Sequence, residues 1–236
     1  MLFLIEVEKG TNMKHLLISL FIVILIVLIS LFCYQLGEKK GYQKGFDIGY
    51  SNQCRISNQE INGKNHFIDK RDGQRYKIVK IGHQVWMAEN LIYKTKYSIC
   101  YNNDESYCKT YGRLYPWNDA IIACPAGWHL PNDNEFNLLI QTVGYQAGKK
   151  LKSSSLWDGT DSLGFNAIGA GSFSPANYIG KNEDAFGGID GNSSFWSATQ
   201  YDDQRAYGRG IEKGKHNVIK FWANKVTGHS VRCIKD

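Results

Sequence analysis

The stretch "CPAGWHLPNDNEF", residues 124–136, contains the clearest local folding signal in the chain. Asn132 can accept hydrogen bonds from the free backbone N–H groups of a helix start, and Glu135, three residues later, completes a capping box. We therefore predict a helix that begins near Asp133 and ends at Gly144 or Gly148. The residues expected to form its apolar face, with Trp128 packed against them, are Leu130, Phe136, Leu139 and Ile140.

Upstream, the segment "DGQRYKIVKIGHQVWMAENL", residues 72–91, has the pattern of a β-hairpin. Tyr76 and Ile78 alternate with charged residues, as expected for a half-buried strand. The sequence Ile-Gly-His-Gln at 81–84 predicts a tight turn between two short strands. Val85, Trp86 and Met87 should then enter the core.

Length and charge limit the class of protein. The chain has 236 residues, enough for one domain and an appendage. Its net charge is +6, but residues 37–80 carry ten Lys and Arg against five Asp and Glu, whereas residues 81–236 carry sixteen against fifteen. Because a nucleic-acid binder concentrates basic residues on its folded module, we expect no nucleic-acid partner.

Residues 16–36, "LLISLFIVILIVLISLFCYQL", contain no charged side chain. About twenty such residues suffice for a helix that crosses a bilayer. The run is longer than the apolar region of about 7–15 residues in a cleavable signal peptide, and no small-x-small site follows it. We therefore predict an uncleaved transmembrane signal anchor in contact with membrane lipid. Lipidation at Cys33 is the alternative, which the bulky Phe32 disfavours. Met13 is an alternative start to Met1.

The remaining segments follow from this anchor: a cytoplasmic N-terminus at 1–15, a stalk and linker at 37–70, and a folded module at 71–236. Gly37, Gly41, Gly45 and Gly49 are spaced four apart. On a helix they would form a small-residue stripe that favours a homodimer, but glycine weakens exposed helices, so we favour a flexible stalk. Cys54 could pair between chains or remain a free thiol.

The orientation signals conflict. Lys39, Lys40 and Lys44 follow the span and only Lys9 and Lys14 precede it, which by the positive-inside rule would keep the C-terminal part in the cytoplasm. The cysteine content favours export. We give the cysteines more weight and expect a periplasmic or extracellular module.

Five blocks along the module resemble one known family. The blocks are the 72–91 segment, "YGRLYPWNDA" at 111–120, the 124–136 segment, "SSFWSAT" at 193–199 and "GHSVRCIKD" at 228–236. In this order they resemble the Fibrobacter succinogenes major paralogous (FISUMP) domain of bacterial surface and secreted proteins. The resemblance implies an α+β, C-type-lectin-like fold with short twisted antiparallel strands, few helices and long loops.

Four cysteines of the module are expected to form two disulfides. Cys100 and Cys108 bracket "YNNDESY", which we interpret as a polar hairpin tip. Cys124 and Cys233 each border a motif of the module, and a bridge between them would close a loop of about 110 residues. Four cysteines in an exported domain are typical of such a framework.

No catalytic constellation is evident in the sequence. His129 could be imagined as a general base with Glu135, but no serine or cysteine stands in a known nucleophile motif, and we expect a structural role. Zinc-binding spacings are absent. The family is also similar to formylglycine-generating oxidases, which hold copper with two cysteines; here the late Cys233 is expected to be in a disulfide, so we predict no enzyme.

The most plausible ligand surface combines residues 153–192 with the hairpin tip at 201–209, because the resemblance places variable binding loops in the second half of the fold. Trp157, Tyr178 and Tyr207 could contact a sugar or a protein, with core packing as the alternative for Trp157. Calcium is a further possibility, although we favour solvated acidic groups. The residues that could bind calcium in the 181–192 loop are Glu183, Asp184, Asp190 and Asn192. The segment Trp117-Asn118-Asp119 is a second candidate, but we expect Asn118 or Asp119 to cap a helix instead.

We therefore expect a membrane-anchored, non-catalytic module that binds a glycan or a surface protein. An envelope enzyme related to the oxidases and a structural subunit of a surface assembly are the alternatives.

Overall fold

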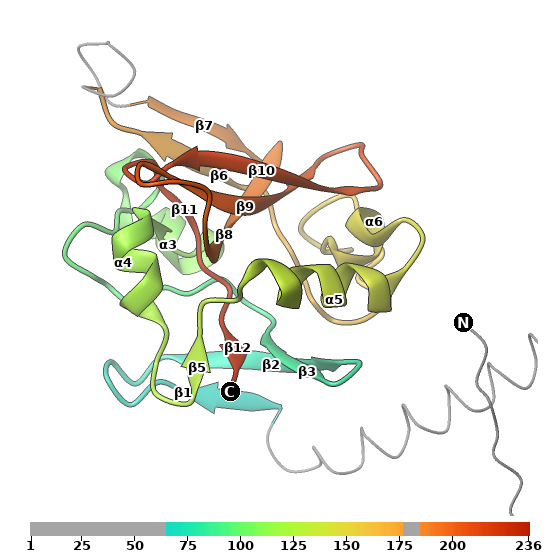
Figure 1. Cartoon of the computed structure of the whole chain (residues 1–236). Coiled ribbons are helices and arrows are strands. Elements are labelled where there is room, and N and C mark those ends of the chain that lie inside the picture. Colours follow the sequence, from blue (N-terminus) through green and yellow to red (C-terminus); the bar gives the residue numbers. More distant parts are fainter. Residues whose placement is uncertain (1–64, 177–184) are drawn as a thin grey trace, which may run out of the picture. The chain divides into compact units, whose positions relative to one another are not determined.

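Two β-sheets and four short α-helices make up residues 65–176 and 185–236, the part of the chain that the computed structural model describes (Figure 1). One sheet has the order β1 (His66–Ile68), β2 (Arg75–Ile81), β3 (Gln84–Met87), β12 (Ile234–Lys235), β5 (Trp128–His129). The other has the order β10 (Val218–Asn224), β9 (Arg205–Glu212), β8 (Asn192–Gln200), β11 (His229–Ser230), β4 (Leu114–Tyr115), with β6 (Ala170–Ser174) beside β8 and β7 (Ala185–Ile189) beside β6. The helices are α3 (Glu105–Tyr111), α4 (Trp117–Ala123), α5 (Asp133–Val143) and α6 (Ala147–Leu151), and η2 (Tyr101–Asn103) is a 3-10 turn. The expected α+β class is confirmed.

The predicted hairpin is formed by β2 and β3, which pair from Ile78 opposite Met87 to Ile81 opposite Gln84. Gly82 lies in the turn with φ +61°, a conformation that glycine adopts without steric cost. Trp86 and Met87 are fully buried, as expected.

Strand β1 corrects the predicted linker. Residues 66–68 pair antiparallel with β2, although the sequence assigned 37–70 to stalk and linker. The adjacent Asp69 is buried and accepts hydrogen bonds from Arg71, which also donates to the carbonyl of Ala123. The folded module therefore begins before residue 71, because backbone pairing with β2, the Asp69–Arg71 ion pair and packing of Phe67 against the core hold this short segment.

The predicted N-terminal segments lie outside the described residues. These are the cytoplasmic segment 1–15, the anchor 16–36, Cys33, the Gly37–Gly49 stripe and Cys54. Within residues 65–176 and 185–236, no helix has the length and apolarity needed to cross a membrane.

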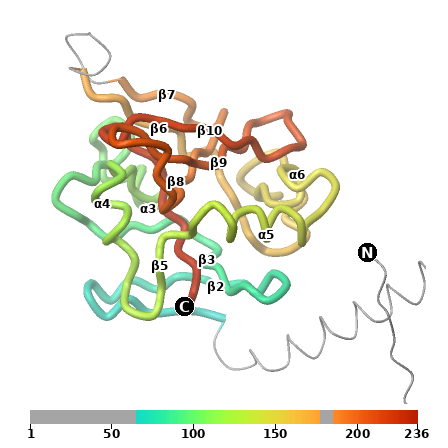
Figure 2. Tube along the Cα trace, viewed as in Figure 1, coloured from blue at the N-terminus to red at the C-terminus, as the bar shows by residue number. Residues whose placement is uncertain are grey.

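The segment from β11 to β12 connects the two sheets (Figures 1 and 2). Strand β11 pairs with β8 and β4, and β12 pairs with β3 and β5. Between them Arg232 is fully buried and donates hydrogen bonds to Asn90 Oδ1 and to the carbonyls of Met87 and Phe165. Burial lowers the pKa of Arg232 to about 9. These bonds fasten the end of the chain to two distant segments, residues 87–90 and the loop at Phe165.

Helix α5 matches the prediction at both ends. Asn132 accepts hydrogen bonds from Asn134 N and Glu135 N, the Glu135 side chain returns a bond to Asn132 N, and Gly144 is the C-cap. Phe136 and Leu139 are buried, together with Val143.

The expected packing of Trp128 on helix α5 is wrong. Trp86 lies against Phe136 instead, with ring centroids 5.4 Å apart. Trp128 packs with Phe67 of β1, 5.2 Å away, in a separate core cluster. Consecutive side chains of the two-residue strand β5 lie on opposite faces of the sheet. The pairing of Trp128 with Lys235 of β12 therefore fixes the face, and so the core cluster, that the Trp128 ring enters.

The sequence predicts loops at residues 153–192, but the described part of this segment also contains two strands. Strands β6 and β7 form an antiparallel pair in which Phe173 lies opposite Phe186. The aromatic ring of Phe186 also lies 5.2 Å from that of Tyr101. Regular structure arises here because aromatic side chains from η2 and β6 cover the β7 strand.

Candidate functional site

Both predicted disulfides are confirmed. Cys124 and Cys233 are bonded across 109 residues of sequence, and Cys100 and Cys108 across 8. The long-range bond joins the segment before β5 to the segment before β12, and these two strands are neighbours in the five-stranded sheet. It therefore ties the 124–136 corner to the C-terminus, as predicted.

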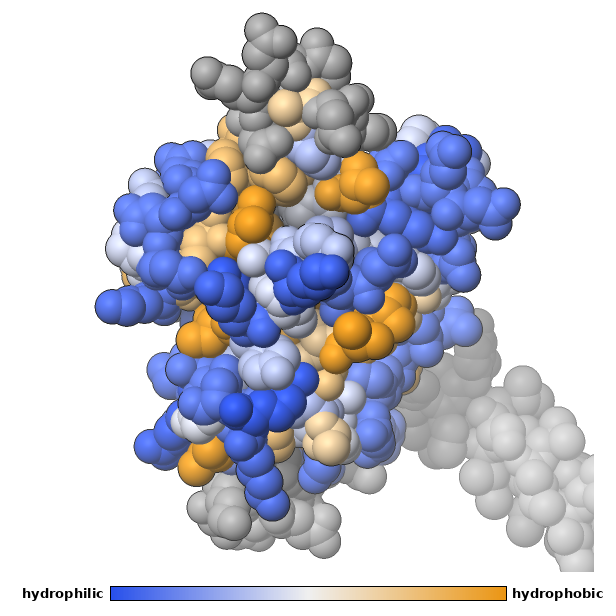
Figure 3. Space-filling view, turned by 90° about the vertical axis from the view of Figure 1, so that its left-hand side faces the viewer, coloured by the Kyte–Doolittle hydropathy of each residue, from blue (hydrophilic) through white to orange (hydrophobic). Residues whose placement is uncertain are grey.

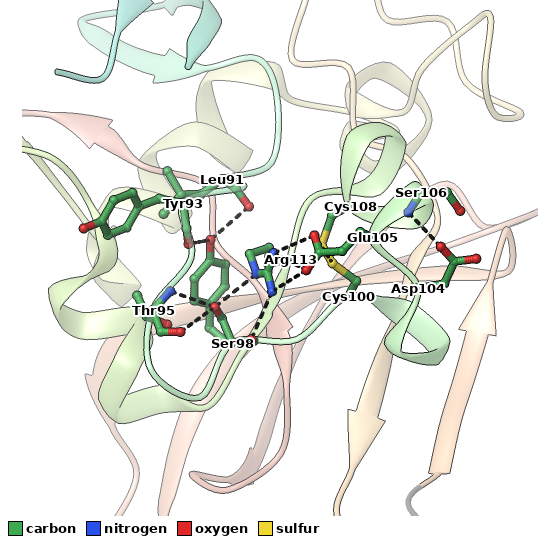
Figure 4. The surroundings of a disulfide bond; sticks show 11 residues. Leu91, Tyr93, Thr95, Ser98, Cys100, Asp104, Glu105, Ser106, Cys108 and Arg113 are labelled. Carbon is green, nitrogen blue, oxygen red and sulfur yellow. Dashed lines mark hydrogen bonds and ion pairs between the residues drawn. A yellow bond between two sulfur atoms is a disulfide. The ribbon is translucent and has the colours of Figure 1, made fainter. Parts of the chain in front are cut away.

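The residues between Cys100 and Cys108 form helix rather than a hairpin tip. Asp104 is the N-cap of α3 and accepts a hydrogen bond from Ser106 N (2.8 Å), so it begins the helix that carries Cys108. Figure 4 shows Arg113 between Ser98 and Glu105 beside the disulfide, with Nη1 3.1 Å from the Glu105 carboxylate. The one group of potential metal ligands in the described residues combines Glu105 with these two bonded cysteines, which makes the group structural.

His129 is held between two carboxylates. Its Nε2 lies 2.8 Å from Glu135 Oε1, and its Nδ1 lies 2.6 Å from Asp236 Oδ1. Burial alone lowers the pKa of His129, but the bonds to Asp236 and Glu135 raise it overall. When protonated, the His129 ring can donate to both carboxylates at once. His129 therefore links α5 to the C-terminus.

Of the four acidic or amide residues considered for calcium, the structure describes Asp190 and Asn192. Asp190 lies in the turn between β7 and β8 and accepts a hydrogen bond from the Tyr111 hydroxyl (2.8 Å). Asn192 begins β8, with its side-chain oxygen buried and unpaired among the described residues. Tyr178, Glu183 and Asp184 lie outside the described residues. Among the described residues, Asp190 and Asn192 belong to no group of potential metal ligands.

Trp157 lies beside the same turn and is half-buried against the core. Its Nε1 donates to the Asp190 carbonyl (2.9 Å), and Lys152 Nζ lies 5.3 Å from its ring centroid. Lys152 itself is buried and paired with Asp158 at 2.8 Å. Trp157 therefore connects the 153–164 loop to the β7–β8 turn.

The Trp117-Asn118-Asp119 segment has a different role from the one expected. It forms the first turn of α4, whose N-cap is Pro116 without a side-chain cap bond, so the predicted capping by Asn118 or Asp119 is wrong. The Asp119 carboxylate accepts a bond from Tyr97 N (2.9 Å) and the Trp117 indole donates to the Ser197 carbonyl. These contacts hold the loop before α3 and strand β8 against α4.

An aromatic cluster is exposed where the turn between β8 and β9, residues 201–204, meets the last residues of β10. We call Tyr201, Tyr207 and Trp222 the aromatic platform. Tyr201 and Trp222 are stacked, with centroids 5.6 Å apart and an interplanar angle of 18°, and Tyr201 meets Tyr207 edge-on at 5.2 Å. Trp222 is 51% exposed and Tyr201 is 44% exposed. Large aromatic surfaces of this kind are energetically costly to leave in water.

Strand register builds the platform. Trp222 lies directly opposite Tyr207 in the β9–β10 pair, and Lys220 lies opposite Arg209. Side chains two residues apart on a strand share a face, so Lys220 and Trp222 point to the same side of β10. The sequence prediction included Tyr207 and missed Trp222. The alternation in "VIKFWAN", residues 218–224, is the signal that places Lys220 and Trp222 together.

Asp133 joins the platform to helix α5. Its carboxylate lies 2.6 Å from Arg209 Nη1 and 2.7 Å from Lys220 Nζ. Burial raises the pKa of Asp133, but the hydrogen bonds from Arg209 and Lys220 lower it overall. Since Lys220 Nζ also lies 3.7 Å from the centroid of the Tyr207 ring, the start of α5 fixes the position of this ring.

Exposed aliphatic side chains do not form a comparable surface on the side of α3 and α4. Figure 3 shows apolar side chains there as separate spots between polar ones, in the part of this face that described residues form. Ile121 and Ile122 of α4 are among the exposed apolar residues. Scattered residues of this kind are common on soluble domains, which leaves the aromatic platform as the better candidate site.

Comparison with known proteins gives one assignment. No curated protein and no solved structure matches the chain. The model of the Fibrobacter succinogenes major domain matches residues 79–235, from β2 to the last strand. The matched region includes both disulfides, the capped helix α5 and the aromatic platform. The chain belongs to the Fibrobacter succinogenes major domain family.

Proposed function

We propose that this protein is a membrane-anchored, non-catalytic binding module of C-type-lectin-like type that faces the periplasm or the exterior and binds a glycan. The apolar segment 16–36 supplies the anchor in this proposal. Two disulfides support an oxidising compartment, because such bonds are rare in the cytoplasm. Both ring nitrogens of His129 lie within hydrogen-bond distance of a carboxylate, from Asp236 and from Glu135, which disfavours a role as general base and so the enzyme alternative.

The exposed aromatic platform is the observation that carries the proposal. Stacked aromatic rings offer a sugar ring a flat apolar surface, and the polar groups around them can bind its hydroxyls. Trp222 and Tyr201 are rigidly placed by stacking and strand register, so little conformational entropy is lost on binding.

A glycan array probed with the full-length chain in detergent micelles tests the proposal. We expect binding to a restricted set of glycans. Trp222→Ala should weaken it about 30-fold, since a central aromatic contact is worth about 2 kcal/mol or more. Tyr145→Ala is the matched control, because Tyr145 is 83% exposed and follows α5, outside the platform.

Two outcomes would count against glycan binding at this site. Glycan binding that survives Trp222→Ala would move the site elsewhere in the chain. Absence of binding to every glycan would favour a protein ligand or a structural subunit of a surface assembly.

A further inference from the structure

The aromatic platform is surrounded by cations. The Arg205 guanidinium carbon lies 4.3 Å from the Trp222 ring centroid and 4.6 Å from that of Tyr201. Lys220 Nζ lies 3.7 Å from the Tyr207 centroid. Cations are attracted to the negative face of an aromatic ring, and here they bring hydrogen-bond donors to the edge of the exposed rings.

Positive charge exceeds negative charge around these rings. The single carboxylate of Asp133 is shared by Arg209 and Lys220, and Asp202 pairs with Arg205. Lys225 Nζ donates to two uncharged acceptors in the same turn, Gln200 Oε1 and the Asp203 carbonyl. With the Asp203 side chain included, the four cations (Arg205, Arg209, Lys220, Lys225) face three carboxylates (Asp133, Asp202, Asp203), which leaves an excess of one positive charge.

Lys220 is the cation best placed to contact a ligand. An ammonium group has three N–H donors. Among the described residues, Lys220 Nζ donates a hydrogen bond to one acceptor, Asp133 Oδ2, and the Lys220 side chain is 45% exposed. Lys220 lies two positions from Trp222 on the same face of β10. A donor that remains open to solvent beside an exposed indole can bind a negatively charged substituent of a ring stacked there.

We infer that the platform binds an acidic polysaccharide, in which a sugar ring stacks on Trp222 and a carboxylate of the polymer binds Lys220. This inference depends on the proposed function and adds the ligand class to it. A charge-assisted hydrogen bond is stronger than a neutral one, so the acidic polymer should be preferred to an uncharged polymer with the same backbone. The nearly neutral module as a whole does not favour nucleic acid as the source of the negative charge.

Affinity electrophoresis of the full-length chain in detergent micelles tests the inference with two matched polymers, polygalacturonate and its fully methyl-esterified form. Esterification removes the charge and keeps the sugar backbone. We expect binding to polygalacturonate at least about tenfold tighter than to the ester, as for one charge-assisted hydrogen bond. The preference should shrink as NaCl is raised from about 50 to 500 mM, because salt screens exposed charges.

Variants of Lys220 locate the effect. Lys220→Gln should abolish the preference for the acid, and Lys220→Arg should retain it. Lys213→Gln is the control, because Lys213 is exposed in the turn at the opposite end of the same hairpin. Near-UV circular dichroism of each variant checks that the fold is intact. If Lys220→Gln does not fold, the ester comparison on the unmodified protein still decides the question.

The possible outcomes separate this inference from the proposed function. Equal binding of both polymers, sensitive to Trp222→Ala, would overturn the acidic ligand and leave glycan binding in place. If the protein binds neither polymer but binds a neutral glycan on the array, the acidic ligand is likewise overturned and glycan binding remains. Stronger binding to single-stranded nucleic acid than to polygalacturonate would also overturn it. Binding of no glycan at all would remove both proposals.

Discussion

Removal of each disulfide separately should give two clearly different losses of stability. The bonds span 109 and 8 residues of sequence. In the chain-entropy model, the longer bond contributes ~4.8 kcal/mol to the free energy of unfolding and the shorter one ~2.5 kcal/mol, because the longer loop restricts the unfolded chain more. We therefore expect Cys124→Ala with Cys233→Ala to be less stable than Cys100→Ala with Cys108→Ala by about 2 kcal/mol.

The measurement is urea unfolding of the full-length chain in detergent micelles, followed by tryptophan fluorescence, which reports on the buried Trp86 and Trp196. For a domain of this size the two double variants should also differ in melting temperature by roughly 5–9 °C. Alanine is chosen because it introduces no polar group at these positions, of which Cys100, Cys108 and Cys233 are buried. Equal losses, or a larger loss for the Cys100 and Cys108 pair, would refute the entropic reasoning and indicate that local packing around α3 dominates.

Three further perturbations have defined outcomes. The two carboxylates raise the pKa of His129 above its ordinary 6.5, so the stabilisation from this link is complete below about pH 6.5 and fades as the pH rises through the raised value. Because His129 is 40% exposed, His129→Gln should cost less than about 1 kcal/mol at pH 5.5 and still less at pH 9, as measured by urea midpoints; equal losses at both would contradict the linkage. Burial lowers the pKa of His229 to about 3, so in the unmodified protein stability should fall as the pH drops from 6.5 towards 3, when the unfolded state binds a proton that the folded state excludes. His229→Phe, which keeps a ring between Trp196 and Phe221, should flatten this fall in acid titrations, and an unchanged slope would assign it to other groups. Gly82→Ala should destabilise the protein by about 1 kcal/mol in thermal unfolding because of its positive φ, whereas Gly127→Ala, also at positive φ but with open space around it, tests whether contact with Thr142 adds to the cost at Gly82.

Structural features that depend on a few neighbouring residues could be predicted from the sequence. The capping box at Asn132 and Glu135 and the turn at Gly82 depend on neighbours within four residues, and both are present as expected. The helix that carries Cys108 was not predicted, although Asp104 followed by Glu105 is itself a helix-start signal. Polar residues between two cysteines are equally typical of a hairpin tip, so composition alone does not distinguish the two structures.

Side-chain partners across the fold could not be inferred in the same way. Trp128 was expected on α5 but packs with Phe67, because the pairing of β5 with β12 decides which face it occupies. The buried Arg232 finds its acceptors on segments around residues 87–90 and at 165. Such contacts depend on the positions of several elements at once.

The amino-acid sequence by itself determined the family and the α+β class, through the resemblance of five motifs in a shared order. It also determined the two disulfides and the capped helix, because these rest on local spacing and on the pairing of four cysteines in one module. Only the tertiary structure decided the candidate site. Tyr201, Tyr207 and Trp222 come from three segments and meet because the β9–β10 register and the Asp133 ion pairs bring them together. The "CPAGWHLPNDNEF" segment contributes to that site as well, since the capping box that begins α5 places Asp133 against Lys220, beside the aromatic platform.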